Sequence, residues 1–141
     1  MEVINWETLD ELEYLTTFRG TKLTDDGLNL LANKASIEHV DIRNSVFSNL
    51  SSLTLLTNLS TLELYRTTVD DWQDLINIEL TNLSVQDTNF TDASLINASV
   101  RFFDGSNTDI TNLPLLSSLE QLNRLYLWGV NADDWSFLSS L

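Results

Sequence analysis

One phrase occurs twice in this chain, and the repetition limits the possible folds more than any other feature of the sequence. Residues 62–72 read LELYRTTVDDW, and residues 125–135 read LYLWGVNADDW. Leucines, an aromatic residue and a closing Asp-Asp-Trp stand at the same places in both phrases. A phrase that recurs within 141 residues predicts a chain built from stacked copies of one short structural unit.

The two phrases belong to a longer array of six units with one spacing of apolar residues. In the third unit Leu59, Leu62 and Leu64 lie eight, five and three positions before a marker residue, Thr67, and Val69 lies two after it. The other units repeat this frame, although Gly105 replaces a bulky residue and Leu15 of the first unit lies one position out of register. Successive markers are 20 to 24 residues apart, at Thr21, Ser45, Thr67, Thr88, Thr108 and Val130.

Each unit predicts a short strand before its marker. Alternation places Leu62 and Leu64 on one face of a strand, while Glu63 and Tyr65 point to the other. After the markers come polar pairs that we interpret as helix N-caps, since their oxygens can accept free N–H groups of the following turn. The pairs are Thr24–Asp25, Ser48–Asn49, Asp70–Asp71, Thr91–Asp92, Thr111–Asn112 and Asp133–Asp134.

The segments after the caps differ in their ability to form helices. Residues 27–31 can form a short helix, whereas residues 50–53 and 113–116 allow only a turn or a 3₁₀ segment. Trp72 and Trp135 occupy the same turn of their units, and we expect both indoles to seal the core.

The frame L-x-x-L-x-L with a period near 22 residues resembles the leucine-rich repeat family over roughly residues 12–141. The first unit, GTKLTDDGLNLLAN, is similar to repeats of many bacterial members that read Thr-x-Ile-Thr-Asp-x-Gly-Leu. The resemblance implies an α/β repeat solenoid, a right-handed superhelix with a parallel sheet on its concave face. Short helices, 3₁₀ segments or turns would form the convex face. The family's usual marker asparagine is replaced by Thr, Ser or Val130.

The ends of the array need separate treatment, because terminal repeats expose apolar surface. Residues 1–14 combine apolar positions with acids and are expected to form an N-terminal capping segment, followed by a repeat domain over residues 15–141. No comparable cap follows the sixth unit. We therefore expect an open edge formed by Leu122, Leu125, Leu127 and Leu138.

The charge balance limits the possible partners. Seven Lys and Arg residues against 21 Asp and Glu residues give a net charge of −14, which repels nucleic acids and anionic membranes and favours a basic protein. The chain has no cysteine, and neither an export signal nor a membrane-spanning run is evident, so we expect a cytoplasmic protein.

The predicted concave face carries an unusual set of side chains. Five of the seven basic residues lie on or beside its strands, all of them Arg, together with exposed aromatic residues. Arginine and aromatic residues often anchor protein interfaces. The candidate partner-binding residues are Arg19, Arg43, Glu63, Tyr65, Arg66, Asp87, Phe102, Asp104, Arg124, Tyr126 and Trp128. The alternative is structural: Arg43 would pair with Glu63 or Asp41, and the aromatic rings would fill gaps between strands.

Other site chemistries have little support. Acids at the turns form a rim that could grip a basic partner or Ca²⁺, although capping explains most of them. The single histidine, His39, has no apparent catalytic partners, and the four glycines form no phosphate-binding loop. We therefore expect no catalytic residues, no metal site and no cofactor.

These observations predict a protein-binding module. The favoured hypothesis is a small acidic stoichiometric inhibitor, or immunity-type protein, that binds a basic protein through its concave face. The alternative is a self-associating structural or adaptor protein that pairs, for example as a homodimer, through its C-terminal edge. A third hypothesis is an array that positions a catalytic domain lying outside this sequence. The resemblance itself selects no ligand, because the family includes inhibitors, adaptors and host-interaction proteins.

Overall fold

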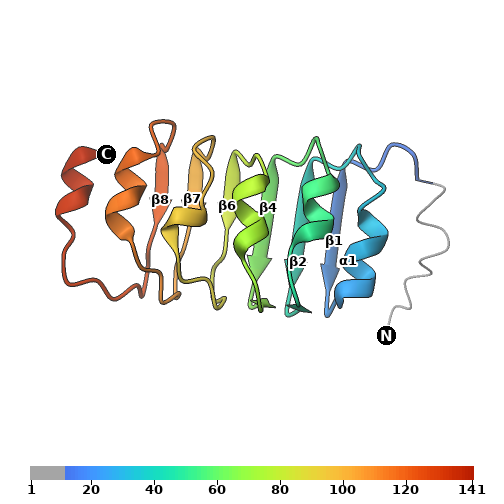
Figure 1. Ribbon diagram of the computed structural model, residues 1–141, viewed down its shortest axis with the longest axis horizontal. Helices are drawn as coiled ribbons and strands as arrows, with labels where there is room; N and C mark the ends of the chain where they lie inside the picture. The colour runs from blue at the N-terminus through green and yellow to red at the C-terminus, as the bar shows by residue number, and fades with distance from the viewer. Residues whose placement is uncertain (1–11) are drawn as a thin grey trace.

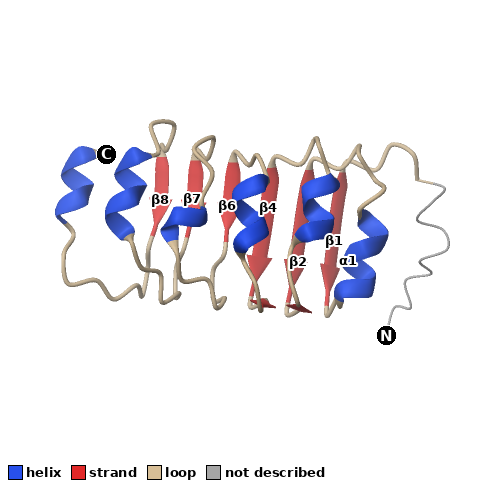
Figure 2. Ribbon diagram, in the orientation of Figure 1, coloured by secondary structure: helices blue, strands red, loops and turns tan. Residues whose placement is uncertain are grey.

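The computed structural model describes residues 12–141, and the predicted capping segment over residues 1–14 lies almost wholly outside this range. The described chain is an elongated solenoid of two layers (Figures 1 and 2). One layer is a sheet of six parallel strands in chain order. They are β1 (Thr17–Thr21), β2 (His39–Arg43), β4 (Thr61–Tyr65), β6 (Asn82–Ser84), β7 (Phe102–Asp104) and β8 (Arg124–Tyr126).

A small second sheet lies at the turns that follow two of these strands. It pairs β3 (Val46–Phe47) with β5 (Thr68–Val69), also in parallel.

The second layer contains one α-helix, α1 (Asp25–Leu31), and otherwise 3₁₀ segments. This confirms the prediction that residues 27–31 form a helix and that residues 50–53 and 113–116 form only turns or 3₁₀ segments. Pro114 stands at the start of the segment over Leu113–Ser118. The 3₁₀ segments are η2 (Ser51–Leu55), η3 (Gln73–Asn77), η4 (Ala93–Leu95), η5 (Leu113–Ser118) and η6 (Ser136–Ser140). None of the helices in residues 12–141 is long and apolar enough to cross a membrane.

The core fills the space between the two layers. Leu62 and Leu64 are fully buried, as their alternation predicts, and they pack with three fully buried aromatic residues, Phe47, Phe90 and Phe103. Gly105 occurs where four other units carry a bulky residue and the first unit carries Gly20, which pairs with Ile42. The ring of Phe103 fills the space at Gly105, since a Cβ there would lie 2.9 Å from it.

The structure corrects the register of the first unit. The sequence frame aligned Thr21 with Ser45, which would place Arg19 beside Arg43. The sheet instead pairs Arg19 with Asp41 and Thr21 with Arg43, so the position in line with Ser45 belongs to Leu23. The Leu23 N–H donates to Ser45 Oγ over 2.8 Å.

Backbone geometry explains this correction. The residue before each true marker adopts a left-handed conformation, with φ between 49° and 70°, at Lys22, Asn44, Arg66, Asp87, Asn107 and Gly129. Leu15 then falls eight positions before its marker and packs against the core like its counterparts. The prediction was wrong because Thr21 resembles the other markers chemically, whereas a buried Leu23 occupies the marker position.

Hydroxyl groups at the markers, buried at Ser45 and Thr108 and half-buried at Thr88, bind the backbone of the turns. Ser45 Oγ donates to Arg43 O over 3.0 Å, and Thr88 Oγ1 donates to Val85 O over 2.7 Å. Thr108 Oγ1 donates to Gly105 O over 2.6 Å. Short hydroxyl side chains thus satisfy backbone groups that would otherwise be buried without partners.

Four of the six polar pairs act as predicted. Asn49, Asp71, Asp92 and Asp134 each accept a hydrogen bond from the backbone N–H two residues later, at 2.8 to 3.0 Å. Hydrogen bonds from Asn112 and Ser94 lower the pKa of Asp92 below its usual range, and bonds from Ser136 do the same for Asp134.

The other two pairs do not cap their own segments. Asp25 instead accepts hydrogen bonds from Ser48 of the next unit, and Asn112 adopts a left-handed conformation and donates to Asp92.

Candidate functional site

The outer side of the six-stranded sheet, here called the sheet face, corresponds to the predicted concave face. Strand register arranges its outward side chains in three rows. The middle row contains Arg19, Asp41, Glu63, Ser84, Asp104 and Tyr126. A second row contains Thr17, His39, Thr61, Asn82, Phe102 and Arg124. The third row contains Thr21, Arg43 and Tyr65, and backbone hydrogen bonds continue the stacking near Gln86, Ser106 and Trp128.

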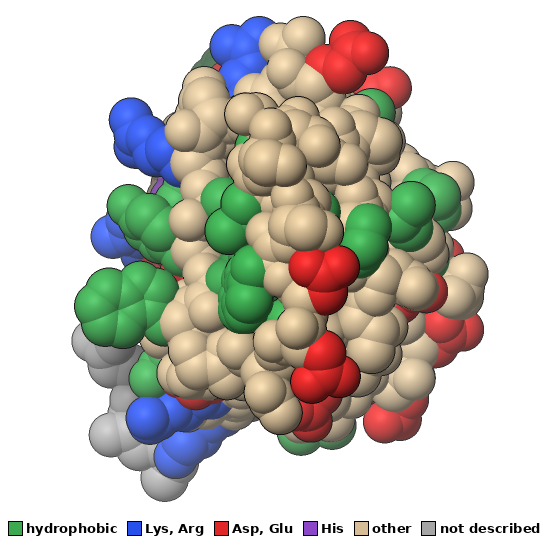
Figure 3. Space-filling view, turned by 90° about the vertical axis from the view of Figure 1, so that its left-hand side faces the viewer, with side chains coloured by type: hydrophobic (Ala, Val, Ile, Leu, Met, Phe, Trp, Pro, Cys, Tyr) green, Lys and Arg blue, Asp and Glu red, His purple; other side chains and the backbone are tan. Residues whose placement is uncertain are grey.

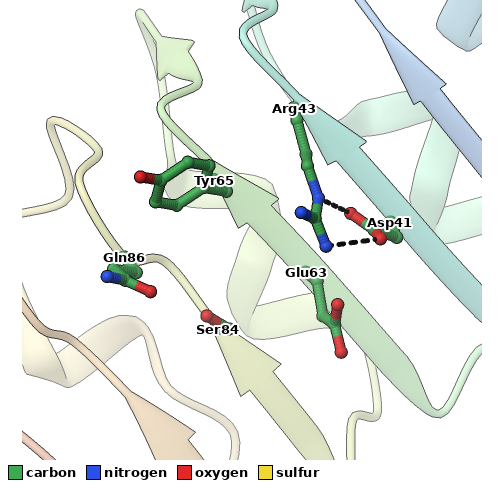
Figure 4. Close-up of a pocket in the computed structure, with 6 residues that line it drawn as sticks. All are labelled: Asp41, Arg43, Glu63, Tyr65, Ser84 and Gln86. Atoms are coloured by element: carbon green, nitrogen blue, oxygen red, sulfur yellow. Dashed lines mark hydrogen bonds and ion pairs between the residues drawn. The ribbon is translucent and has the colours of Figure 1, made fainter.

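Among residues 12–141 we describe three depressions on the sheet face, and the first contains an ion pair (Figure 4). Arg43 donates to both carboxylate oxygens of Asp41 from one edge of its guanidinium group, Nε to Oδ1 at 2.8 Å and Nη2 to Oδ2 at 2.9 Å. Glu63, Tyr65, Ser84 and Gln86 line the rest of the depression. The hydrogen bonds and charge of Asp41 raise the pKa of Arg43 above its ordinary value. The pairing of Arg43 with Asp41, one of the two that the structural alternative named, is present, and it occupies both charged groups.

The second depression has an excess of positive charge. Arg101 and Arg124 line it with Phe102, and Glu63 is its acidic residue. Glu63 Oε1 also lies 3.8 Å from His39 Nε2, which makes no hydrogen bond in the described structure. Both arginines are exposed, so they can accept an acidic group of a partner.

The third depression is the most aromatic. Tyr126 and Trp128 line it and are 48% and 79% exposed, large fractions for side chains of this size. Asp104 is the charged residue of its lining, and Gln86, Ser106, Asn107 and Gly129 complete it. Phe102 packs edge-to-face against Tyr126, with ring centroids 5.4 Å apart, and so braces the ring from the second depression.

The structure brings most of the predicted residues together. Those that line the depressions are Arg43, Glu63, Tyr65, Phe102, Asp104, Arg124, Tyr126 and Trp128. Arg19 lies beside them, with Nε 3.7 Å from Asp41 Oδ2. Arg66 and Asp87 instead occupy left-handed turn positions at the rim, where Arg66 stacks on Tyr65 at 4.9 Å.

Sequence reasoning left several lining residues outside the candidate set. Asn82, Gln86, Arg101, Asn107 and Asn123 all contribute to the depressions. Asn82 could have been found by counting six positions back from its marker, as for Phe102 and Arg124. Asn107 stands one position before its marker, as Arg66 and Asp87 do, so the same count could have found it. Asn123 lies outside the strands, where the strand frame carries no signal.

Basic and acidic side chains are unevenly distributed over the molecule. Figure 3 shows the C-terminal end: Lys, Arg and large hydrophobic side chains lie along the left margin, where the sheet is, and Asp and Glu predominate on the right. Three acids, Asp71, Asp92 and Asp134, cap 3₁₀ segments, as described above. Among residues 12–141, no group of three or more His, Asp or Glu side chains could hold a metal ion.

Six parallel strands in register, each followed by a short helix or 3₁₀ segment, define a leucine-rich repeat solenoid. An internalin of Listeria monocytogenes, inlF, has a similar solved structure, with a TM-score of 0.73 and 21% sequence identity. The match covers 92% of this chain but 40% of the internalin chain, so the present chain spans less than half of that protein. No protein-family model and no curated protein matches the sequence.

Proposed function

We propose that this protein binds another protein through the sheet face, as a small stoichiometric inhibitor or immunity-type protein with a basic partner. The observation that carries the proposal is the pair of exposed aromatic residues, Tyr126 and Trp128, beside acidic and arginine-lined depressions. Aromatic and arginine side chains bury a large surface area on binding, and their polar atoms can still form directional hydrogen bonds with the partner.

Charge supports a basic partner. The net charge of −14 attracts cationic proteins from a distance and speeds their encounter, most strongly at low salt. Arginines on the sheet face then set the orientation, because an acidic group of the partner fits the second depression. This arrangement favours one docking geometry over nonspecific attraction to the acidic side.

The test is a pull-down with the tagged protein from its native cells at low and moderate salt, with mass spectrometry of stoichiometric partners. We expect a basic protein that dissociates as salt rises. The Tyr126→Ala/Trp128→Ala variant should lose several kcal/mol of binding free energy, as truncated anchors do. The matched control is Leu55→Ala/Ile76→Ala, because these side chains are exposed on 3₁₀ segments of the opposite layer. Unchanged affinity in the aromatic variant would reject the sheet face as the binding site.

Self-association is a second candidate, favoured by apolar side chains at the C-terminal end. Leu138 and Leu141 are 46% and 51% exposed, and hydrophobic side chains lie across this end in Figure 3. Pairing of two copies here would bury them. Sedimentation velocity should then show a dimer that Leu138→Ser/Leu141→Ser abolishes and Leu55→Ser leaves intact. A monomer at all concentrations would eliminate this candidate.

A further inference from the structure

The third depression combines features that fit one particular chemical group. Tyr126 and Trp128 provide two exposed aromatic rings, and Asp104 provides the negative charge. In the first depression Arg43 already binds Asp41, and Glu63 has a single aromatic neighbour there, Tyr65, whose ring is covered by Arg66. In the second depression Arg101 and Arg124 outnumber Glu63. Among the three depressions, the third therefore suits a positively charged ligand best.

The walls of this depression are held in place by the backbone. Trp128 N–H donates to Ser106 Oγ over 3.2 Å, and Asn107 N–H donates to Trp128 O over 2.7 Å. Gly129 has φ of +70°, and a Cβ there would collide with Asn107 Oδ1. Because glycine allows this close turn, the Trp128 backbone is fixed before any ligand arrives.

Asp104 has capacity left to bind a ligand. Its Oδ1 accepts the Ser106 N–H over 2.9 Å, which orients the carboxylate. This is the one side-chain hydrogen bond of Asp104 within the described residues, so Oδ2 can accept a further donor. A carboxylate held in this way and next to aromatic rings can form a charge-assisted hydrogen bond with little reorganisation.

We propose that the third depression receives an arginine side chain of the partner protein, an inference that rests on the proposed function. A planar guanidinium group stacks on aromatic faces and donates to a carboxylate at the same time. Tyr126 and Trp128 supply the faces, and Asp104 supplies the acceptor. The basic character proposed for the partner thus becomes a specific contact with one side chain.

The test uses a small probe, so that it does not depend on the natural partner. The full chain is titrated with the peptide acetyl-Gly-Arg-Gly-amide, and with the same peptide carrying citrulline, which keeps the shape and removes the charge. Binding is followed by the NMR signal of the Trp128 indole N–H, assigned by its loss in Trp128→Phe. We expect a saturable shift of this signal, and an affinity for the citrulline peptide about tenfold lower.

Asp104→Asn and Asp109→Asn are the matched pair of variants. Both remove one negative charge, but Asp109 is exposed and does not line the depression. Asp104→Asn keeps an oxygen for the Ser106 N–H and should weaken arginine binding about tenfold, whereas Asp109→Asn should not. Spectra with undisturbed core signals verify that each variant is folded.

Equal affinity for the two peptides, or equal affinity in the two variants, would overturn the arginine inference. The protein-binding proposal would still stand if the Tyr126→Ala/Trp128→Ala variant lost a natural partner. Conversely, arginine binding without any effect of those two residues on a natural partner would uphold the depression's chemistry and reject the proposed function.

Discussion

The third and sixth units carry the same phrase, yet the structure treats its residues differently. Leu62, Leu64 and Trp72 of the third unit are buried. In the sixth unit Leu125 and Leu127 are only partly buried, and Trp135 is 38% exposed. The expectation that both tryptophans seal the core is confirmed for Trp72 and is wrong for Trp135, which stacks on Phe137 at the edge of the structure.

The difference arises from the neighbours on the C-terminal side. Strand β4 lies between β2 and β6, whereas β8 has β7 as its neighbour in the sheet. The unit after Trp72 supplies Phe90, which packs against the indole at 5.1 Å, and Asn89, whose Oδ1 accepts the indole N–H over 3.2 Å. A residue's burial in a solenoid thus depends on the next unit as much as on its own.

Replacing the two tryptophans tests most directly whether the third and sixth units differ in burial. We expect Trp72→Ala to lower the free energy of unfolding by about 3–5 kcal/mol, since it removes a buried ring and leaves a cavity. Trp135→Ala should cost less, about 2 kcal/mol, because over a third of that residue's surface is already in water. Urea unfolding followed by far-UV circular dichroism measures both. Equal losses would show that the two indoles are equally buried in solution.

The leucines of β4 and the last strand region provide a second, smaller contrast. Leu64→Ala should cost about 3 kcal/mol, as expected for a fully buried leucine, and Leu127→Ala about half as much. Unfolding is measured at two protein concentrations. If the loss at Leu127 matched that at Leu64 and grew with concentration, a second copy would cover the C-terminal end, in favour of self-association.

The markers differ in chemistry as well as in burial. Thr67 Oγ1 accepts the buried Ser45 N–H, so Thr67→Val should cost about 1 kcal/mol by leaving that donor without a partner. In Val130→Thr the new hydroxyl can bind Leu127 O, as Thr108 binds Gly105 O, and the change should stay within about 0.5 kcal/mol. Thermal unfolding compares the two, and a larger loss at Val130 would contradict this account.

The sequence predicted the parts of the fold that depend on periodicity. Alternation around Leu62 and Leu64 identified the strands and their buried faces, and polar residues such as Asp92 identified the caps. The register of the first unit was wrong because it depends on the left-handed turn at Lys22, which is not evident from a lysine. The predicted burial of Trp135 was wrong because the burial of this position depends on contacts with a neighbouring unit, and one unit's sequence does not contain them.

The candidate site was predictable to a similar extent. Counting from the markers placed Tyr126, Trp128 and Asp104 on one face, and the structure joins them in one depression. Counting could not show that Arg43 donates two hydrogen bonds to the carboxylate of Asp41, since that depends on side-chain conformation. Nor could it show that Arg66 and Asp87 occupy turn positions at the rim.

The smallest expected contrast concerns the paired acids that close the two phrases. Asp71 accepts one hydrogen bond, from the Gln73 N–H, whereas Asp134 accepts two, from the N–H and the hydroxyl of Ser136. These bonds hold the pKa of Asp134 below its ordinary value of 3.8. The stabilisation they give is therefore complete above that value and is lost as pH falls through the lower, folded-state pKa.

Alanine substitutions at Asp134 and at Ser136 measure this stabilisation. Asp134→Ala should lower the melting temperature slightly at pH 5 to 7, and the gap from the parent protein should close as pH falls below about 4. Ser136→Ala removes one of the two bonds and should give a smaller gap. If the gap at Asp134 stayed constant down to pH 3, the carboxylate would not be the stabilising form. Asp134 would then stabilise its turn equally well in the protonated form. Its difference in charge state would not distinguish the ends of the two phrases.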